Sequence, residues 1–249
     1  MADRTPRLAL LIDADNIPAR HIGAILEELA AFGEPTVRRV YGDWSSQALG
    51  QWKEKARDLG LVMHQQSANT KGKNASDIGL VIDAMDILHA GKVDGFVLVS
   101  SDSDFTRLAS RIREDGLQVI GVGEAKTPDS LRKVCNRFLL IENFVGNAAP
   151  GAEPKDEPRA QERQEPREPR PEKRPALEAL PLILDAMQKI DPEGDWYSLG
   201  VIGNFLNRLY PDFDPRSFGA PKLSDLVRRL PRFEVDARTP GHLFLRDRS

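Results

Sequence analysis

The sequence predicts an α/β protein in which helices flank a mostly parallel sheet, followed by a smaller module of winged-helix type. Short β-rich runs alternate with helical patterns from residue 8 to residue 123. A stretch rich in proline and charge then interrupts the chain, and the remainder is helical first and stranded last. Alternating strands and helices imply right-handed crossovers, which produce a parallel sheet covered on both faces.

Five runs of β-branched and apolar residues, each bounded by turn-forming residues, are predicted strands. They span residues 8–13, 36–42, 60–65, 95–101 and 117–123. Four segments between them carry apolar residues at helical spacing, and each closes on a glycine, a common helix terminator. These helical segments span residues 18–33, 45–60, 74–91 and 104–116.

The stretch from residue 146 to residue 175 reads "GNAAPGAEPKDEPRAQERQEPREPRPEKRP" and cannot form a core. Seven acidic residues offset seven basic ones, and seven prolines oppose both helix and sheet. This composition predicts a disordered, extended linker, with an electrostatic arm for RNA or a partner as the alternative. The expected domains are therefore residues 1–145 and 176–249.

After the linker, three amphipathic helices and then two strands are predicted, which suggests a small winged-helix module. The helices span residues 175–190, 198–210 and 220–231, and the strands span 233–237 and 242–247. Helix-turn-helix geometry commonly serves nucleic acid, although a fold alone does not establish a function. Its 10 lysines and arginines stand against 11 acidic residues, so RNA affinity would depend on segregation of charge onto one face.

Composition excludes several classes of site. The formal net charge of −3 gives no general basic field, so any nucleic-acid contact must come from local patches. The single cysteine, Cys135, can form neither an internal disulfide nor a cysteine-based zinc site, and its apolar neighbours indicate an inert thiol. No run approaches the roughly 18 apolar residues of a membrane span. A cytoplasmic protein without membrane association is therefore expected.

Carboxylates follow two of the predicted strands where each strand ends. Asp13 lies at the end of the first strand in "LLIDADN", and Asp102 and Asp104 follow the fourth in "VLVSSDSDF". If these strands are neighbours, both clusters meet at the crevice outside the carboxyl ends of the strands, where such sheets bind ligands. Asp104 could instead cap the following helix, and Asp15 with Asn16 could be turn chemistry.

A third carboxylate comes from "KGKNASDIGLVIDAMD", where Asp77 lies in the first turn of a predicted helix that Asn74 caps. Asp77 could also serve only to complement the helix dipole. At about 100° per residue, Asp83 is rotated away from the exposed tip of this helix. Asp83 and Asp86 are therefore expected to be surface or salt-bridge residues.

Four carboxylates in one pocket repel one another unless a cation offsets their charge. The oxygen-only set Asp13, Asp77, Asp102 and Asp104 favours Mg²⁺ or Mn²⁺ over zinc. Lys71 and Lys73, on a glycine-containing loop before Asp77, could hold phosphate oxygens.

Trp44, which follows the second strand, could stack a base or pack in the core. His64 reads as an ordinary strand-end residue.

Three motifs in order resemble the NYN domain, a branch of the PIN-like nucleases that includes the LabA-like (DUF88) proteins. They are "LLIDADNIP", "KGKNASDIGLVIDAMD" and "FVLVSSDSDFTRLASRIREDGLQVIGVG". The resemblance implies a PIN-like, Rossmann-like fold with strand order 3-2-1-4-5 and metal-dependent ribonuclease activity. The acidic positions of the family fall on Asp13, Asp77, Asp102 and Asp104, with Asn16 and Ser101 as accompanying polar residues that would face the substrate.

The segment "GDWYSLGVIGNFLNRLYPDFDPRSFGAPKLSDLVRRLPRFEVD" is similar to an OST-HTH/LOTUS domain. This implies RNA binding or, in some relatives, docking to a protein partner. Trp196 and Phe213 are expected in the core of this domain. The candidates for phosphate contact are Lys222, Arg228, Arg229 and Arg232.

Three functions are compatible with these residues. The leading hypothesis is a Mg²⁺- or Mn²⁺-dependent endoribonuclease whose flexibly tethered second domain recruits RNA. The second is an RNA-binding regulatory adaptor whose acidic pocket binds metal weakly and does not catalyse a reaction. The third is a phosphatase, because "IDADN" superficially resembles the nucleophile loop of haloacid-dehalogenase-like enzymes. However, Asn16 occupies the position where that loop has threonine or valine.

Overall fold

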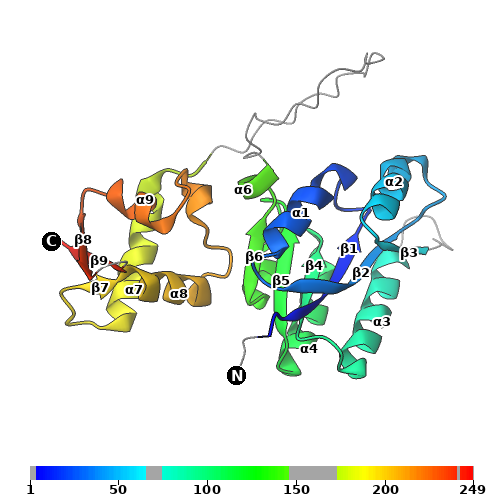
Figure 1. The fold of residues 1–249 in the computed structure, drawn as a ribbon, viewed down its shortest axis with the longest axis horizontal. Helices are drawn as coiled ribbons and strands as arrows, with labels where there is room; N and C mark the ends of the chain where they lie inside the picture. The colour runs from blue at the N-terminus through cyan, green and yellow to red at the C-terminus, as the bar shows by residue number, and fades with distance from the viewer. Residues whose placement is uncertain (1–3, 66–74, 146–172, 240–241, 249) are drawn as a thin grey trace, which may run out of the picture.

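The computed structural model describes residues 4–65, 75–145, 173–239 and 242–248. They form two bodies, a sheet domain up to residue 145 and a C-terminal domain over residues 173–248, which lie side by side (Figure 1). Within these residues, no helix combines the length and the hydropathy needed to cross a bilayer.

The sheet domain contains a six-stranded parallel sheet in the order β3-β2-β1-β4-β5-β6. Its strands are β1 (Arg7–Asp13), β2 (Glu34–Gly42), β3 (Val62–Gln65), β4 (Gly95–Val99), β5 (Gln118–Gly123) and β6 (Arg137–Leu140). This confirms the predicted parallel sheet and the predicted order of its first five strands. The two strands that carry the acidic motifs, β1 and β4, are therefore direct neighbours in the centre.

Helices cover both faces of this sheet, so each face has its own apolar core (Figure 1). One core receives α1 (Ile22–Leu29), α2 (Gly50–Asp58) and α6 (Glu142–Val145). The other receives α3 (Ala75–Ala90), α4 (Thr106–Glu114) and α5 (Asp129–Val134). Short 3-10 turns precede three of these helices: η1 (Ala19–His21), η2 (Gln47–Leu49) and η3 (Ser103–Phe105).

Alternation along β1 determines which face each of its side chains meets. Leu10 and Ile12 pack in the core under α1 and α2, whereas Ala9 and Leu11 pack in the core under α3 and α4. Because successive side chains of a strand point to opposite faces, Asp13 follows Leu11 toward the face that α3 and α4 cover. The last residue of β1 therefore points to the face of the sheet that α3, the helix that carries Asp77, helps to cover.

The sequence did not predict α5 and β6. Cys135 lies between them and is buried; burial raises the pKa of its thiol to about 12, which fits the expected inert thiol. The thiol donates to the carbonyl of Leu131 at 3.2 Å. Elements of six and four residues are too short to show a hydrophobic period, so the pattern alone could not identify them.

The C-terminal domain has three helices and a three-stranded antiparallel sheet, consistent with the predicted winged-helix type. Its helical elements are η4 (Ala176–Ala179), α7 (Leu180–Ile190), α8 (Leu199–Leu209), η5 (Pro215–Phe218) and α9 (Leu223–Arg228). Its strands, in the order β7-β9-β8, are β7 (Tyr197–Ser198), β8 (Phe233–Thr239) and β9 (His242–Asp247).

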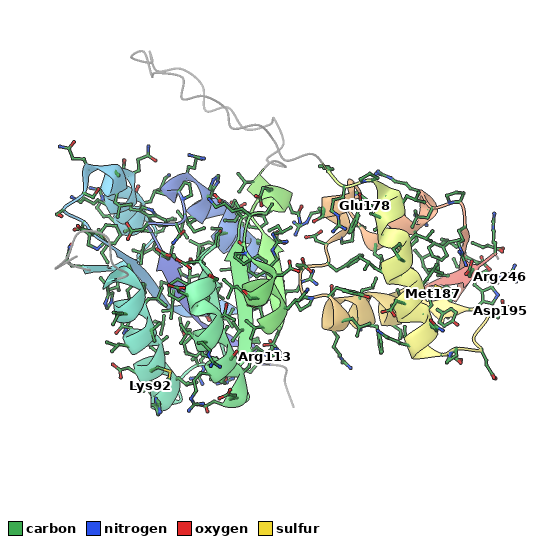
Figure 2. All side chains as sticks on the ribbon, turned by 180° about the vertical axis from the view of Figure 1, so that it is seen from behind. Lys92, Arg113, Glu178, Met187, Asp195 and Arg246 are labelled. Carbon is green, nitrogen blue, oxygen red and sulfur yellow. The ribbon has the colours of Figure 1, made fainter. Side chains whose placement is uncertain are left out.

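Phe213 packs in the core of this domain as predicted, but Trp196 does not. The Trp196 side chain is half-buried, and the Arg246 guanidinium lies 4.8 Å from the centre of its ring. Arg246 and Asp195 project at the end of the domain that faces away from the sheet domain (Figure 2). The expectation of a core tryptophan is therefore wrong, because the Trp196 side chain lies outside the core cluster and a cation from β9 lies over its ring.

Candidate active site at the carboxyl edge of the sheet

The acidic motifs meet because β1 and β4 pair in parallel from Leu8 opposite Gly95 to Ile12 opposite Val99. Asp13 follows Ile12, and Ser100 follows Val99. These two residues therefore lie side by side where the strand pairing ends. Both residues are buried. The carboxyl edge of the two central strands thus presents a carboxylate beside a hydroxyl, at the position where parallel α/β sheets bind ligands.

Asp13 is held by neutral hydrogen-bond donors. Its Oδ2 accepts from the Asn16 side-chain amide at 2.6 Å and from the Ser100 hydroxyl at 2.9 Å. Its Oδ1 accepts from the backbone N–H of Asp15 at 3.2 Å. The turn after β1 therefore folds back on the carboxylate and fixes its orientation, which explains why a polar "DADN" sequence follows an apolar strand.

Burial raises the pKa of Asp13 above its ordinary value, although the hydrogen bonds from Asn16 and Ser100 oppose this rise. The nearby charge that acts on this carboxyl is that of Asp15, which also raises the pKa. A buried carboxylate surrounded by neutral donors and another acid is costly to ionise. A bound cation would remove that cost.

Ser100 links Asp13 to the second acidic motif. Its Oγ accepts from the backbone N–H of Asp102 at 3.1 Å while its hydroxyl donates to Asp13. Asp102 in turn caps η3, because its Oδ1 accepts from the backbone N–H of Asp104 at 2.9 Å. The helix-capping carboxylate is thus Asp102, and Asp104 stands in the first turn with its side chain exposed.

The structure gives the adjacent serines Ser100 and Ser101 different partners. Ser101, the predicted accompanying residue, accepts from the backbone N–H of Glu124 at 3.0 Å and so joins the end of β4 to the end of β5. Ser100 is the serine that contacts Asp13. Ser100 was not predicted because the apolar pattern extends the fourth strand to residue 101, two residues beyond its observed end at Val99.

The remaining predicted site residues lie in or beside α3. Asp77 belongs to the first turn of α3, but its side chain is outside the described part of the structure, as are Lys71 and Lys73 altogether. The helix contacts β1, β2 and η3. Because α3 follows β3 and runs antiparallel to the strands, its first turn lies at the carboxyl edge, where Asp13 and Asp102 also lie.

The donor chemistry of this edge fits a hard divalent cation. Asp13, Asp102 and Asp104 offer only oxygen atoms, and Asp13 is buried among neutral donors. Among side chains that the structure describes, no three histidines, cysteines or acids already converge as a metal cluster. The described part of the edge therefore supplies one fixed carboxylate and two more on the adjoining turn.

A second polar cluster, which the sequence pattern did not predict, lies on the same face of the sheet. Asp83 on α3 accepts from the Tyr41 hydroxyl at 2.8 Å, and its Oδ2 lies 2.7 Å from Arg39 Nη1 and 3.2 Å from His64 Nδ1. Burial raises the pKa of Asp83, but hydrogen bonds from Tyr41 and Arg39 outweigh it and bring the pKa below its ordinary value.

This arrangement confirms the expected ion-paired role of Asp83, and Asp86 is exposed as expected. His64 is more than an ordinary strand-end residue, because it contributes to this cluster. Trp44 packs rather than presenting a free face: it is 9% exposed, and its indole N–H donates to the His64 carbonyl at 2.9 Å.

Two family descriptions match this chain. The family description "NYN domain" matches residues 7–142, and "OST-HTH/LOTUS domain" matches residues 174–245. No curated protein matches the chain. Among solved structures, a protein of unknown function from Vibrio parahaemolyticus is 20% identical, with a TM-score of 0.48, over 57% of this chain and 96% of that one.

Proposed function

The chain belongs to the NYN family, whose members are PIN-like nuclease domains, and on this premise we propose that it is a metal-dependent endoribonuclease that cleaves RNA phosphodiester bonds. Its OST-HTH/LOTUS domain belongs to a class that binds RNA, and it would bind the RNA substrate. The observation that carries the proposal is Asp13, a buried carboxylate with a raised pKa at the carboxyl edge of the central strands.

The cofactor of this proposal is Mg²⁺ or Mn²⁺, held by Asp13, Asp77, Asp102 and Asp104. When bound, such an ion lowers the pKa of a water and offsets the charge that develops on a phosphodiester. Asn16 and Ser100 would act by orienting Asp13, since both donate to the same carboxylate oxygen. Lys71 and Lys73 are proposed to hold phosphate oxygens of the RNA beside the first turn of α3.

The described C-terminal domain offers exposed cations for RNA on and near α9. Lys222 is exposed, and so are Arg228 and Arg229. Arg232 is already occupied, because it donates to both Asp247 oxygens at 2.7 and 2.8 Å. Arg228 lies 3.8 Å from Asp225, and Arg229 donates to the Gly219 carbonyl at 2.7 Å, but neither makes a two-point contact with a carboxylate. We therefore expect Lys222, Arg228 and Arg229 to contribute more to RNA affinity than Arg232.

A cleavage assay on single-stranded and structured RNAs, with and without Mn²⁺, tests the proposal. Asp102→Asn keeps an oxygen that can cap η3 but removes the charge, so it should abolish Mn²⁺-stimulated cleavage while the protein stays folded. Asp86→Asn is the matched control, because Asp86 is exposed on α3. Unchanged cleavage by Asp102→Asn would overturn the assignment of this carboxylate.

The regulatory adaptor is the competing function, and the same assay separates the two. An adaptor would bind RNA and be stabilised by Mn²⁺ without cleaving any substrate of the panel. That outcome, with a folded wild-type protein, would contradict the ribonuclease proposal and leave the RNA-binding part intact.

A further inference from the structure

The C-terminal domain contacts the sheet domain along the β6 edge. The backbone N–H of Phe138 in β6 donates to the carbonyl of Pro211 at 2.8 Å. An edge strand leaves part of its backbone without a strand partner, and such groups favour pairing with another segment. The segment between α8 and η5 thus supplies an acceptor to an edge group of the sheet, in agreement with the placement of the two domains in Figure 1.

Arg216 of the C-terminal domain forms the charged centre of this contact. It donates to the Glu28 carboxylate on α1 at 2.5 and 3.1 Å, and to Asp214 of its own domain at 2.7 and 2.9 Å. Its guanidinium also lies 6.0 Å from the centre of the Phe144 ring on α6. The side chains of Arg216 and Glu28 are 22% and 23% exposed, so solvent screens this pair less than a surface ion pair.

The charges around this centre are complementary across the two domains. Arg132 on α5 lies 3.5 Å from Asp212 of the C-terminal domain. Arg137 on β6 donates to Asn207 on α8. Burial lowers the pKa of Arg137, and the negative charges of Asp214 and Glu28, one from each domain, oppose that shift. Each domain therefore places carboxylates where the other places guanidinium groups.

A neutral contact completes the junction. The Asn143 side-chain amide donates to the Ser217 hydroxyl at 2.9 Å. Backbone pairing, opposite charges and neutral hydrogen bonds thus coincide on one strip of the sheet domain, formed by α1, α5, β6 and α6. We call this strip the docking strip.

From this coincidence we infer that the docking strip is a specific binding surface whose occupant is the chain's own C-terminal domain. The domain is held in one orientation beside the sheet instead of moving freely on its linker. The candidate active site is built on β1, β4, η3 and α3, and β5 separates β4 from the β6 edge where the domain docks. A docked domain would therefore hold a bound ligand in a constant orientation relative to the site. The consequence for RNA rests on the proposed function, whereas the docking does not.

Nuclear magnetic relaxation of backbone amides in the intact protein tests the docking. In the wild type at low ionic strength, amides of both domains should report one shared rotational correlation time. Separate values, with a clearly shorter one for the smaller C-terminal domain, would overturn the inference. Neither RNA nor cleavage enters this readout, so its failure is distinguishable from failure of the proposed ribonuclease.

Charge reversal on the docking strip supplies the variant. Glu28→Arg places a cation against Arg216 and should abolish the shared correlation time. Glu27→Arg is the matched control, because Glu27 is the exposed neighbour on the same helix, and it should keep the shared value. If Glu28→Arg impairs folding, Asp212→Lys in the C-terminal domain replaces it. This variant places a lysine against Arg132 and should likewise abolish the shared correlation time.

Hydrogen exchange of the Phe138 amide gives a second measurement. Undocking removes its acceptor, so its exchange should accelerate in Glu28→Arg and stay slow in Glu27→Arg. Equal exchange in both variants and the wild type would contradict the inference. A second copy of the chain is the competing occupant, and a dimeric mass from light scattering together with shared tumbling would show that docking occurs between molecules, against the proposal.

Discussion

Asp13 and Asp83 lie on the same face of the sheet, yet their carboxylates have opposite surroundings. Asp83 is paired with the Arg39 guanidinium and accepts a hydrogen bond from the Tyr41 hydroxyl, and these partners lower its pKa in spite of burial. Among the residues that the structure describes, Asp13 accepts hydrogen bonds from neutral donors only, and burial raises its pKa. The cluster around Asp83 contains a cation, Arg39, whereas the described residues around Asp13 supply no cation to its carboxylate.

Under the proposed function, this difference separates a structural acid, Asp83, from a functional one, Asp13. A carboxylate that is paired and hydrogen-bonded within the fold contributes to stability and has little need of a ligand. A carboxylate that is buried without a cation costs free energy, and proteins keep such groups where they bind or react. Equivalent substitutions at Asp13 and Asp83 test this division.

The largest expected effect is on activity at Asp13. Asp13→Asn should lower Mn²⁺-dependent cleavage of single-stranded RNA by at least about 100-fold, the scale of losing one group that stabilises a transition state. Asp83→Asn should cleave within a few-fold of the wild type. Initial rates on the same RNA check both variants, and an active Asp13→Asn protein would show that the division is wrong.

Metal should stabilise the protein only by binding at the site that contains Asp13. A ligand at about 100 times its dissociation constant stabilises the folded state by about 2.7 kcal/mol, so saturating Mn²⁺ should raise the melting temperature of the wild type and of Asp83→Asn. The same addition should leave Asp13→Asn unchanged. Differential scanning calorimetry checks the three proteins, and an equal rise in all of them would place the metal elsewhere.

Without metal, Asp83→Asn should lower the free energy of unfolding more than Asp13→Asn does. Asp83→Asn leaves Arg39 without its carboxylate and weakens the bond to Tyr41, which should cost about 1–3 kcal/mol of unfolding free energy. Asp13→Asn should change stability by less than about 1 kcal/mol, because relief of a buried charge offsets the loss of one hydrogen bond from Asn16 or Ser100. Urea denaturation of the two variants gives the comparison, and equal losses would argue against it.

The stabilisation from Asp83 should disappear in acid. Its pKa is lowered in the folded protein, so its contribution is fully present above the unfolded value of about 3.9 and is lost as pH falls through the folded value. The difference in stability between wild type and Asp83→Asn should therefore shrink as the pH is lowered from neutral to below that range. A difference that stays constant in urea titrations at both ends would contradict the assigned pKa shift.

The smallest expected effect is at Tyr41. Tyr41→Phe removes the hydroxyl that donates to Asp83 but keeps the buried ring, so it should cost about 0.5–1.5 kcal/mol. Activity should not change. A loss larger than that of Asp83→Asn, measured by the same denaturation, would mean that Tyr41 contributes through packing that the hydrogen bond does not explain.

Much of the fold could be predicted because central parallel strands are continuous apolar runs. β1 and β4 are buried along nearly their whole length, so sequence alone identified them and the carboxylates at their ends. α5 and β6 carry no such signal, because each is too short for a period to appear. The contacts of β6 with the C-terminal domain were consequently also out of reach of the sequence, which predicted a flexibly tethered domain.

The details of the site depend on where strands end and on how they pair. Whether Ser100 or Ser101 meets Asp13 depends on the end of β4 at Val99, and strand boundaries are the least certain part of a pattern-based prediction. Likewise, Asp83 receives its cation from Arg39 on a strand more than 40 residues earlier. Only the observed packing of α3 on β2 brings these two residues together.

The most direct test of the division between the two clusters is equilibrium binding of Mn²⁺, followed by the electron paramagnetic resonance signal of the free ion. The wild type and Asp83→Asn should remove Mn²⁺ from solution with the same affinity, and Asp13→Asn should leave the free-ion signal as it is in buffer. Undiminished Mn²⁺ binding by Asp13→Asn would contradict the account.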